Sequence, residues 1–322
     1  MSTIGKILNG KSDFDFRPIW KRSLPISVAL TVISLVLVVV VGLNRSIDFE
    51  GGGIFEVPVD ESVQVEDARD AISDATARIQ RVDDPDGGTF IRVQTGSDAL
   101  DSSDAIVEEL AELGGVTADD VSINEVGPTW GDQITRSAVE ALIFFFIAVL
   151  IYLSVRLEWR MGVGAVIAVV HDLMLIAGVY ALFRFAVSPA TVIALLTIMG
   201  YSLYDTVVVF DKVLEKQEEA GAMADGYTAL VSRSMNQVLM RSINTTITTV
   251  LPVASMLIIG SILLGGATLR DFALALFIGL ILGTYSSIFV AAPVLALLKE
   301  RDPEITAERE KREKRIARKA NR

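Results

Sequence analysis

The sequence contains no cysteine, which excludes disulfide bonds, thiolate metal ligands and cysteine nucleophiles. It has a single histidine, His171, so a histidine-rich metal cluster is excluded as well. Charged residues make up only 21% of the 322 residues, whereas 51% are hydrophobic and the mean hydropathy is +0.49. This composition and its long apolar runs exclude an ordinary soluble protein and are typical of a polytopic membrane protein.

Negative charge is concentrated in one region of the chain. Residues 45–132 carry twenty-two acids and five bases, a balance of −17, although the whole chain has a net charge of −11. The remainder of the chain is therefore positive, at +6. These opposite balances predict that the two regions lie in different compartments.

The apolar runs predict six membrane-spanning helices. Residues 1–23 contain five Lys or Arg and form a cytoplasmic segment, and residues 24–43 are long enough to cross a bilayer. No small-x-small cleavage pattern follows at residues 41–44, so this span is interpreted as an uncleaved anchor and not as a signal peptide. The other spans fall within residues 133–298, at about 137–155, 161–183, 190–210, 243–264 and 272–298, and a charged cytoplasmic tail covers residues 299–322.

The distribution of basic residues predicts the orientation in the membrane. Arg156 and Arg160 follow the second span and ten Lys or Arg lie in residues 299–322, whereas the opposite turns hold one Arg each. Because short cytoplasmic loops are enriched in Lys and Arg, both termini are predicted to be cytoplasmic and residues 44–132 external. The expected location is the cytoplasmic membrane. Residues 225–240 have apolar side chains at helical spacing and are expected to lie on the membrane surface as an amphipathic helix.

The acidic external region, residues 44–132, is predicted to form one α+β domain. The order β-α-β-β-α-β is ferredoxin-like, with two helices on one face of an antiparallel sheet. The predicted fold class is therefore an α-helical polytopic membrane protein with six transmembrane helices and one ferredoxin-like domain between helices 1 and 2. The strand-like segments are 54–59, 77–82, 89–95 and 121–126, the helical patterns are 65–75 and 97–113, and a turn covers 83–88.

The stretch 200–212, GYSLYDTVVVFDK, places an acid, Asp205, in an apolar span. A carboxylate inside a membrane helix is unfavourable by ~2.5–3.5 kcal/mol on insertion scales, so it usually faces a bundle interior or a water path and marks function. Tyr201 and Ser202 lie one turn earlier, where their hydroxyls are predicted to bond this carboxylate. These residues are candidates for ion or proton coupling. A simpler interpretation is an acid near a helix end that reaches water, because Asp211 follows closely.

His171 and Asp172 lie near the middle of the third span, where reaching water is difficult. Histidine has an unperturbed pKa near neutrality, so the pair is a second candidate for proton coupling. An equally good interpretation is a buried polar clasp that fixes helix packing.

The fifth and sixth spans also contain polar or small residues at helical spacing. Arg241 begins a polar stripe on the fifth span, and such a stripe in a membrane faces protein or water. Gly279 and Gly283 on the sixth span are interpreted as a packing face. The other polar residues are Asn244, Thr245, Thr248 and Thr249 on the fifth span, and Thr284, Ser286 and Ser287 on the sixth.

Two glycine-containing connections join the external domain to the membrane. Gly51, Gly52 and Gly53 precede its first strand, and Gly127 with Pro128 follow its last. Both connections are predicted to be hinges, because glycine has wide backbone freedom. The glycine triplet is not a phosphate-binding loop, since it lacks the Lys-Ser/Thr ending.

Several long motifs carry a resemblance to a known family. They are SIDFEGGGIFEV from Ser46, GPTWGDQITRSAV from Gly127, RLEWRMGVGAVIAVVHD from Arg156, GYSLYDTVVVFDK from Gly200 and MRSINTTITT from Met240. At these motifs the chain resembles the SecF side of the SecD/SecF family of the Sec protein-export machinery, in the resistance-nodulation-division superfamily. The resemblance runs from about residue 42 to residue 298.

The resemblance implies a subunit that pairs with SecD, giving twelve spans, and uses an ion gradient, taken here as protons, to move its external domains and assist translocating chains. It also implies that Asp205 matches the family's intramembrane acid and Arg241 its essential arginine. The chain departs from the usual family pattern at Trp130, at Tyr204, where the family usually has Asn, and at Lys212, where it usually has Arg.

The expected partners are the SecD subunit, the Sec translocon channel, the translocating preprotein and membrane lipid. We expect no nucleic acid, no cofactor, no metal and no enzymatic activity. One alternative is a passive scaffold that docks SecD to the translocon. Another is an intramembrane aspartyl protease built on Asp205 and Asp172, although the Gly-x-Gly-Asp motif of those enzymes is missing.

Overall fold

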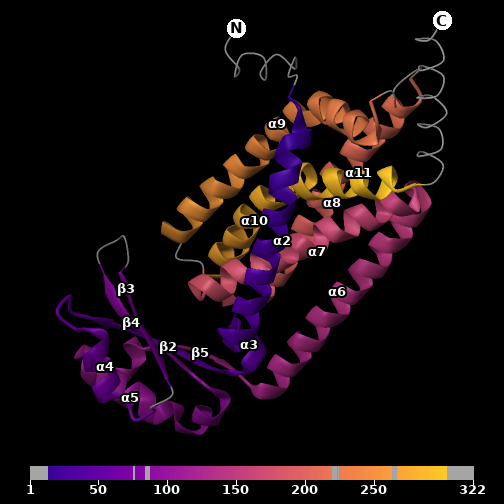
Figure 1. The fold of residues 1–322 in the computed structure, drawn as a ribbon. Coiled ribbons are helices and arrows are strands. Elements are labelled where there is room, and N and C mark those ends of the chain that lie inside the picture. The colour runs from indigo at the N-terminus through magenta and orange to yellow at the C-terminus, as the bar shows by residue number, and fades with distance from the viewer. Residues whose placement is uncertain are drawn as a thin grey trace, which may run out of the picture.

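The protein consists of a helical bundle with a small sheet domain at one end (Figure 1). The computed structural model describes residues 14–74, 77–83, 88–219, 223, 225–262 and 267–302. Much of the predicted N-terminal segment, most of the turn predicted at 83–88 and nearly all of the charged tail lie outside the described residues.

The sheet domain has the predicted β-α-β-β-α-β order. Its elements are β2 (Gly52–Val59), α4 (Val65–Ala71), β3 (Arg78–Asp83), β4 (Thr89–Thr95), a 3-10 turn (Ser97–Ser102), α5 (Ser103–Gly114) and β5 (Ser122–Val126). The strands lie in the order β3-β4-β2-β5 with every pairing antiparallel, which confirms the ferredoxin-like arrangement. Phe55 and Val57 of β2 point to one face, where they are buried against Ile106 and Leu110 of α5.

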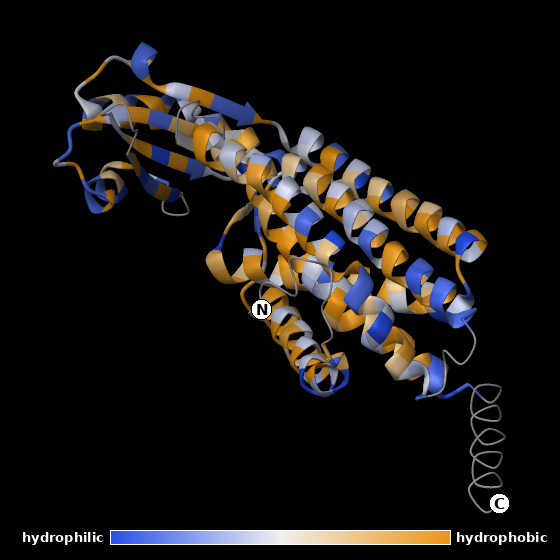
Figure 2. Ribbon diagram, turned by 90° about the horizontal axis from the view of Figure 1, so that it is seen from above, coloured by the Kyte–Doolittle hydropathy of each residue, from blue (hydrophilic) through white to orange (hydrophobic). Residues whose placement is uncertain are grey.

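Six helices are long and apolar enough to cross a membrane, as the hydropathy predicts. Hydrophobic residues dominate these helices, and hydrophilic residues are concentrated in the sheet domain and at helix ends (Figure 2). The helices are α2 (Phe16–Val40), α6 (Pro128–Arg156), α7 (Trp159–Phe183), α8 (Pro189–Gln217), α9 (Tyr227–Ile262), and a last span formed by α10 (Ala267–Ser286), a π-helical turn (Ser287–Ala291) and α11 (Ala292–Glu300).

Helix α2 begins at Phe16 and not at the predicted residue 24. Asp15 caps it, because its carboxylate accepts a hydrogen bond from the backbone N–H of Arg17 at 3.1 Å. The Arg17 side chain also bonds this carboxylate at 2.8 Å and lowers the pKa of Asp15, so the cap is charged at neutral pH. Hydropathy marks only the apolar part of a helix, and here the helix extends further.

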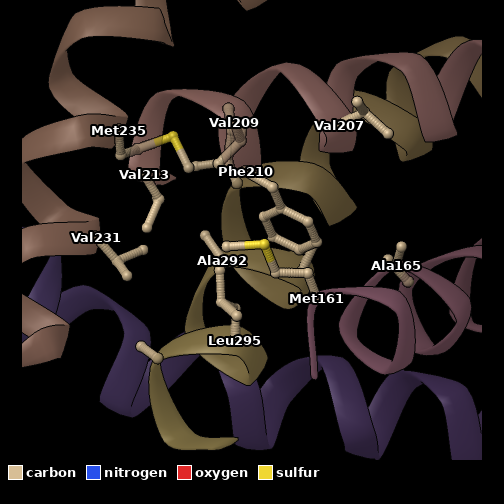
Figure 3. Packing of buried hydrophobic residues seen from close by; sticks show 14 of the residues in the cluster. Met161, Ala165, Val207, Val209, Phe210, Val213, Val231, Met235, Ala292 and Leu295 are labelled. Carbon is tan, nitrogen blue, oxygen red and sulfur yellow. The ribbon is translucent and has the colours of Figure 1, made fainter. Parts of the chain in front are cut away.

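The amphipathic segment predicted to lie on the membrane surface at residues 225–240 is instead the first part of α9. Leu230 is 1% exposed and Met235 is fully buried, so the prediction of a surface helix is wrong. These side chains pack in one hydrophobic cluster with Phe210 of α8 and Leu295 of α11 (Figure 3). An apolar stripe is the same whether lipid or protein covers it, so the sequence alone does not distinguish the two cases.

Small residues let α10 approach α8 closely. A Cβ added at Gly279 would lie 2.3 Å from the Ile198 side chain, and one at Gly283 would lie 3.0 Å from Cβ of Ser202. These close contacts confirm that both glycines serve packing.

Gly178→Ala in α7 is expected to destabilise the protein by about 1–3 kcal/mol, as overpacking usually does. The added Cβ would lie 2.8 Å from the Ser34 Cα of α2, a backbone atom that cannot easily move away. Gly200→Ala is the matched control, because nothing lies within 4 Å of a Cβ there. Thermal unfolding in detergent should show a loss for the first variant and none for the second, and equal losses would contradict the close approach of α2 and α7.

Charged side chains pair at the end of the bundle away from the sheet domain, where α2 begins and α6 and α11 end (Figure 1). Arg156 at the end of α6 pairs with Asp211 of α8 at 3.3 Å. Lys299 pairs with Glu158, and Arg160 pairs with Asp302. This end therefore carries the positive residues that the orientation argument places in the cytoplasm.

Candidate functional site

Asp205 lies on the face of α8 that points into the bundle, and it is 8% exposed. The Ser242 hydroxyl of α9 donates a hydrogen bond to its Oδ1 at 2.7 Å. Its Oδ2 has no hydrogen-bond partner among the residues that the structure describes, although the Ser287 hydroxyl lies beside the carboxyl. This burial argues against a side chain that reaches water at the helix end. An open carboxyl oxygen inside a bundle leaves a position for a proton.

Arg241 of α9 lies near Asp205 but makes no ion pair with it among the described contacts. Its Nη2 donates to the Tyr204 hydroxyl at 2.7 Å, and the guanidinium carbon lies 5.8 Å from the centre of that ring. Its charge still acts electrostatically on Asp205. Arg241 is exposed and Tyr204 is 58% exposed, so both face away from the bundle. Tyr204 therefore holds the arginine on the outer side of α8, at the residue that precedes the acid.

The two hydroxyls predicted to bond Asp205 have other partners. Ser202 donates to Oδ2 of Asp172 at 2.6 Å, and the Tyr201 hydroxyl accepts a hydrogen bond from Thr249 of α9 at 3.5 Å. Residues three apart on a helix differ by roughly 60° around its axis. This rotation is enough to direct Ser202 towards α7 while Asp205 points to α9.

Asp172 joins three helices and is 1% exposed. Its Oδ2 accepts hydrogen bonds from Ser202 of α8 and from Ser286 of α10, the second at 2.8 Å, and its Oδ1 lies 3.3 Å from His171 Nδ1. The His171 ring packs on Tyr285, but its buried Nε2 has no partner among the described residues. The pair does hold helices together, as the clasp interpretation predicts, yet one ring nitrogen is left open.

The residues of the polar stripe on α9 do not all face the same way. Arg241, Asn244 and Thr248 are exposed, whereas Thr249 is half-buried. Ser242, which contacts Asp205, is fully buried and is not a member of the predicted stripe. The stripe begins at Arg241, whereas the very next position points inward. Finding this serine requires the rotation of α9 about its axis, which residue spacing does not determine.

Ser286 and Ser287 also belong to the site, although the sequence pattern does not predict a role for them in proton coupling. The sequence feature that could have identified them is a pair of adjacent serines within an apolar span. Two neighbouring residues of a regular helix point in directions roughly 100° apart, so a regular helix does not predict a shared role. Across the part of the chain that the structure describes, no group of three or more His, Asp or Glu is arranged to hold a metal ion.

The glycine triplet is less free than predicted, because Gly52 and Gly53 belong to strand β2 and pair with β5. Gly52 has a φ of +127°, and a Cβ there would lie 2.1 Å from the backbone oxygen of Thr95, so glycine is required. Gly51, with a φ of 75°, lies between α3 (Ile47–Glu50) and β2. Of the three predicted hinge glycines on this side, only Gly51 lies outside the sheet.

At the second connection, Gly127 caps α6 and Pro128 is the first residue of that helix. Gly131, one turn further on, packs against the backbone of α3, and the Thr135 hydroxyl lies 3.5 Å from the Phe49 backbone oxygen. The start of α6 therefore packs on α3, and Gly127 is the predicted hinge residue that precedes the helix.

The fold and the site define a polytopic membrane protein that buries two carboxyls among its helices and carries a sheet domain at one end of the bundle. Residues 106–301 match the family described as protein export membrane protein SecD/SecF, C-terminal. The chain therefore belongs to the SecD/SecF family.

Relatives named as protein translocase subunit SecF support this membership. The one from Streptomyces coelicolor is 40% identical over 95% of this chain and 83% of its own length, and the one from Mycobacterium tuberculosis is 38% identical over 93% and 70%. A crystal structure of SecDF from Thermus thermophilus, described as a translocon-associated membrane protein, aligns with a TM-score of 0.76 and 32% identity. That alignment covers 91% of this chain and 39% of the SecDF chain.

Proposed function

We propose that this chain works with SecD to couple a proton gradient to the translocation of proteins across the cytoplasmic membrane. The observation that carries the proposal is Asp205, a carboxyl buried between α8 and α9 with one oxygen unpaired among the described residues. The test is whether a gradient still stimulates export in the Asp205→Asn variant.

The arrangement around Asp205 supports a change of conformation on protonation. When the carboxyl is charged, it attracts the nearby Arg241, and when it is neutral, the arginine has only its hydrogen bond to Tyr204. Because Arg241 and Asp205 lie on different helices, this competition acts between α8 and α9. If Asp205 takes up a proton from one side of the membrane and releases it to the opposite side, each step moves α8 relative to α9.

The carboxyl geometry favours transport over proteolysis. An aspartyl protease needs two carboxyls that share a proton and activate one water molecule. In the described structure, Asp172 bonds Ser202, Ser286 and His171, whereas Asp205 bonds Ser242. The two acids therefore have separate partners.

A polar surface on the outside of the bundle supports a partner in the membrane. Arg241, Asn244 and Thr248 of α9, with Tyr204 of α8, are exposed in this chain. Exposed polar groups are costly in lipid, so another protein surface should cover them. We propose SecD as that partner, because the SecDF relative from Thermus thermophilus is 36% identical over 81% of this chain, which corresponds to only 35% of its own length.

The proposed orientation places the sheet domain outside and the charged end of the bundle in the cytoplasm. Because the chain has no native cysteine, single cysteines can report it. Ser102→Cys, at an exposed position of the domain, should react with an impermeant maleimide on intact cells, whereas Glu215→Cys should react only after permeabilisation. The reverse pattern would contradict the orientation.

A further inference from the structure

Two buried carboxyls on neighbouring helices have hydroxyl groups between them. Asp172 of α7 accepts hydrogen bonds from Ser202 and Ser286, and Asp205 of α8 accepts one from Ser242. Ser202 and Asp205 lie on the same helix, so the partners of one acid are neighbours of the other. One helix, α8, therefore carries one of the acids and bonds the other.

Two adjacent serines of the last span lie one beside each acid. Ser286 donates to Asp172 at 2.8 Å, while the Ser287 hydroxyl lies 3.0 Å from that of Thr206 and beside Asp205. Both serine hydroxyls also lie 3.0 Å from the same acceptor, the backbone oxygen of Gly283. They are therefore near each other, and a side-chain rotation or one water molecule can close the gap between them.

A π-helical turn begins at the second of these two serines. Residues 287–291 form this turn, which adds one residue to a helical turn and changes the directions of the side chains around it. Turns of this kind are rare and frequently occur at functional sites. One carbonyl oxygen of the turn, that of Ile288, accepts a hydrogen bond from the Trp20 ring of α2 at 3.0 Å. The irregular backbone is thus supported from a separate helix.

On either side of these serine hydroxyls lies a buried polar atom without a hydrogen-bond partner in the described structure. Nε2 of His171 and Oδ2 of Asp205 are buried, and neither has a partner among the described residues. A purely structural clasp normally pairs every buried polar atom, because an unpaired one costs about 1–3 kcal/mol. Open ends are what a path needs, since a proton must enter and leave.

We propose that Asp205 and Asp172 exchange one proton through the hydroxyls of Ser287 and Ser286, which makes Asp172 a second proton-carrying group. The inference rests on the proposed function. A protonated Asp205 gives its proton to a hydroxyl oxygen, each hydroxyl passes its own proton onward, and the Asp172 carboxylate receives the last one. The hydroxyls are unchanged after they rotate back, so the net result is one O–H bond broken at Asp205 and one formed at Asp172.

Other titratable groups near Asp172 are few in the described structure. His171, on the same helix, contacts this acid, and Tyr285 of α10 packs on the His171 ring. On α2, the Ser27 hydroxyl lies 2.8 Å from the Tyr285 hydroxyl. Neutral His171 can accept a proton from Asp172 or orient it. No Lys or Arg is bonded to this acid among the described contacts.

The experiment compares variants reconstituted with SecD and the translocon, with export measured with and without a proton gradient. Asp172→Asn should reduce the gradient-driven stimulation by about a hundredfold or more, the lower end of the range usual for proton-transfer groups. Ser287→Ala, which removes one link without changing charge, should reduce it partially. Ser255→Ala is the matched control, because this exposed hydroxyl of α9 bonds only its own helix backbone among the described contacts, and it should change nothing.

An infrared difference spectrum between high and low pH supplies a readout that a packing role would not change. The wild-type chain should show two protonated carboxyl bands, one lost in Asp172→Asn and the other in Asp205→Asn. Ser286→Ala should shift the first band, since it removes a hydrogen bond to that carboxyl. Absence of a titrating Asp172 band, or full stimulation in a folded Asp172→Asn when Asp205→Asn abolishes it, overturns this inference alone. Full stimulation in both variants overturns the proposed function.

Discussion

Asp205→Asn is expected to abolish the stimulation of export by a proton gradient while leaving the protein folded. Asparagine cannot take up and release a proton, yet its side-chain oxygen can still accept the hydrogen bond from Ser242. The free energy of unfolding should therefore change by no more than about 1 kcal/mol. Export into membrane vesicles should fall to the level seen in wild type with an uncoupler.

Asp211→Asn is the matched control for this prediction. It removes an acid from the same helix, but one that is half-exposed and paired with Arg156 at the end of the bundle. Surface ion pairs contribute little, so this variant should keep the full stimulation. Equal loss in both variants would indicate a general effect of charge on α8 and would contradict a specific role for Asp205.

Arg241→Met should also remove the gradient-driven stimulation. The variant keeps a long apolar side chain at an exposed position but removes the charge that responds to protonation of Asp205. Insertion should be retained, because the guanidinium makes only one described hydrogen bond within this chain, to Tyr204. SecD should still bind through the rest of the proposed surface, which keeps Asn244 and Thr248. Export with and without an uncoupler measures the effect, and co-purification measures SecD binding.

Two further variants separate the charge of Arg241 from its contact. Tyr204→Phe removes the hydrogen bond but keeps the ring near the guanidinium, so stimulation should fall only partly. Arg233→Met removes an arginine of the same helix that is 48% exposed and bonded to Asp225, and it should have no effect. Full stimulation in Arg241→Met would remove the arginine from the mechanism.

Hydropathy and charge distribution are sufficient to predict the six helices and the sheet domain. An apolar run long enough to cross the bilayer is seldom anything but a membrane helix, and strand alternation next to Gly-rich turns indicates the order of β2 to β5 along the chain. Asp205 and Asp172 are recognisable in the same way. A carboxyl in a long apolar run is conspicuous whatever its partners are.

The partners of these acids depend on rotations that spacing does not determine. Ser202 is predicted to bond Asp205 because it lies one turn away on the same helix, but α7 offers it another acid, Asp172, at 2.6 Å. Ser242 is inconspicuous in the sequence because its exposed neighbour Arg241 carries the charge. Contacts within one helix follow from periodicity, whereas contacts between helices also require the rotation and height of each helix.

The last span contains both a predictable and an unpredictable feature. Both packing glycines are confirmed, because a small-xxx-small pair has a simple steric meaning. A π-helical turn, in contrast, changes the direction of every side chain after it, and no residue of the run 287–291 indicates such a turn. The partners of Ser286 and Ser287, at the start of the turn, depend on how this span is rotated against α7 and α8.

Substrate-dependent proton movement is the measurement that tests the central claim most directly. Proteoliposomes would contain this chain or Asp205→Asn, SecD, the translocon and a preprotein, with a pH-sensitive dye inside. The account predicts that an imposed proton gradient drives proton entry during translocation in wild type, that none occurs with Asp205→Asn or without SecD, and that a sodium gradient alone has no effect. Equal proton entry in wild type and Asp205→Asn, or stimulation by sodium alone, would contradict it.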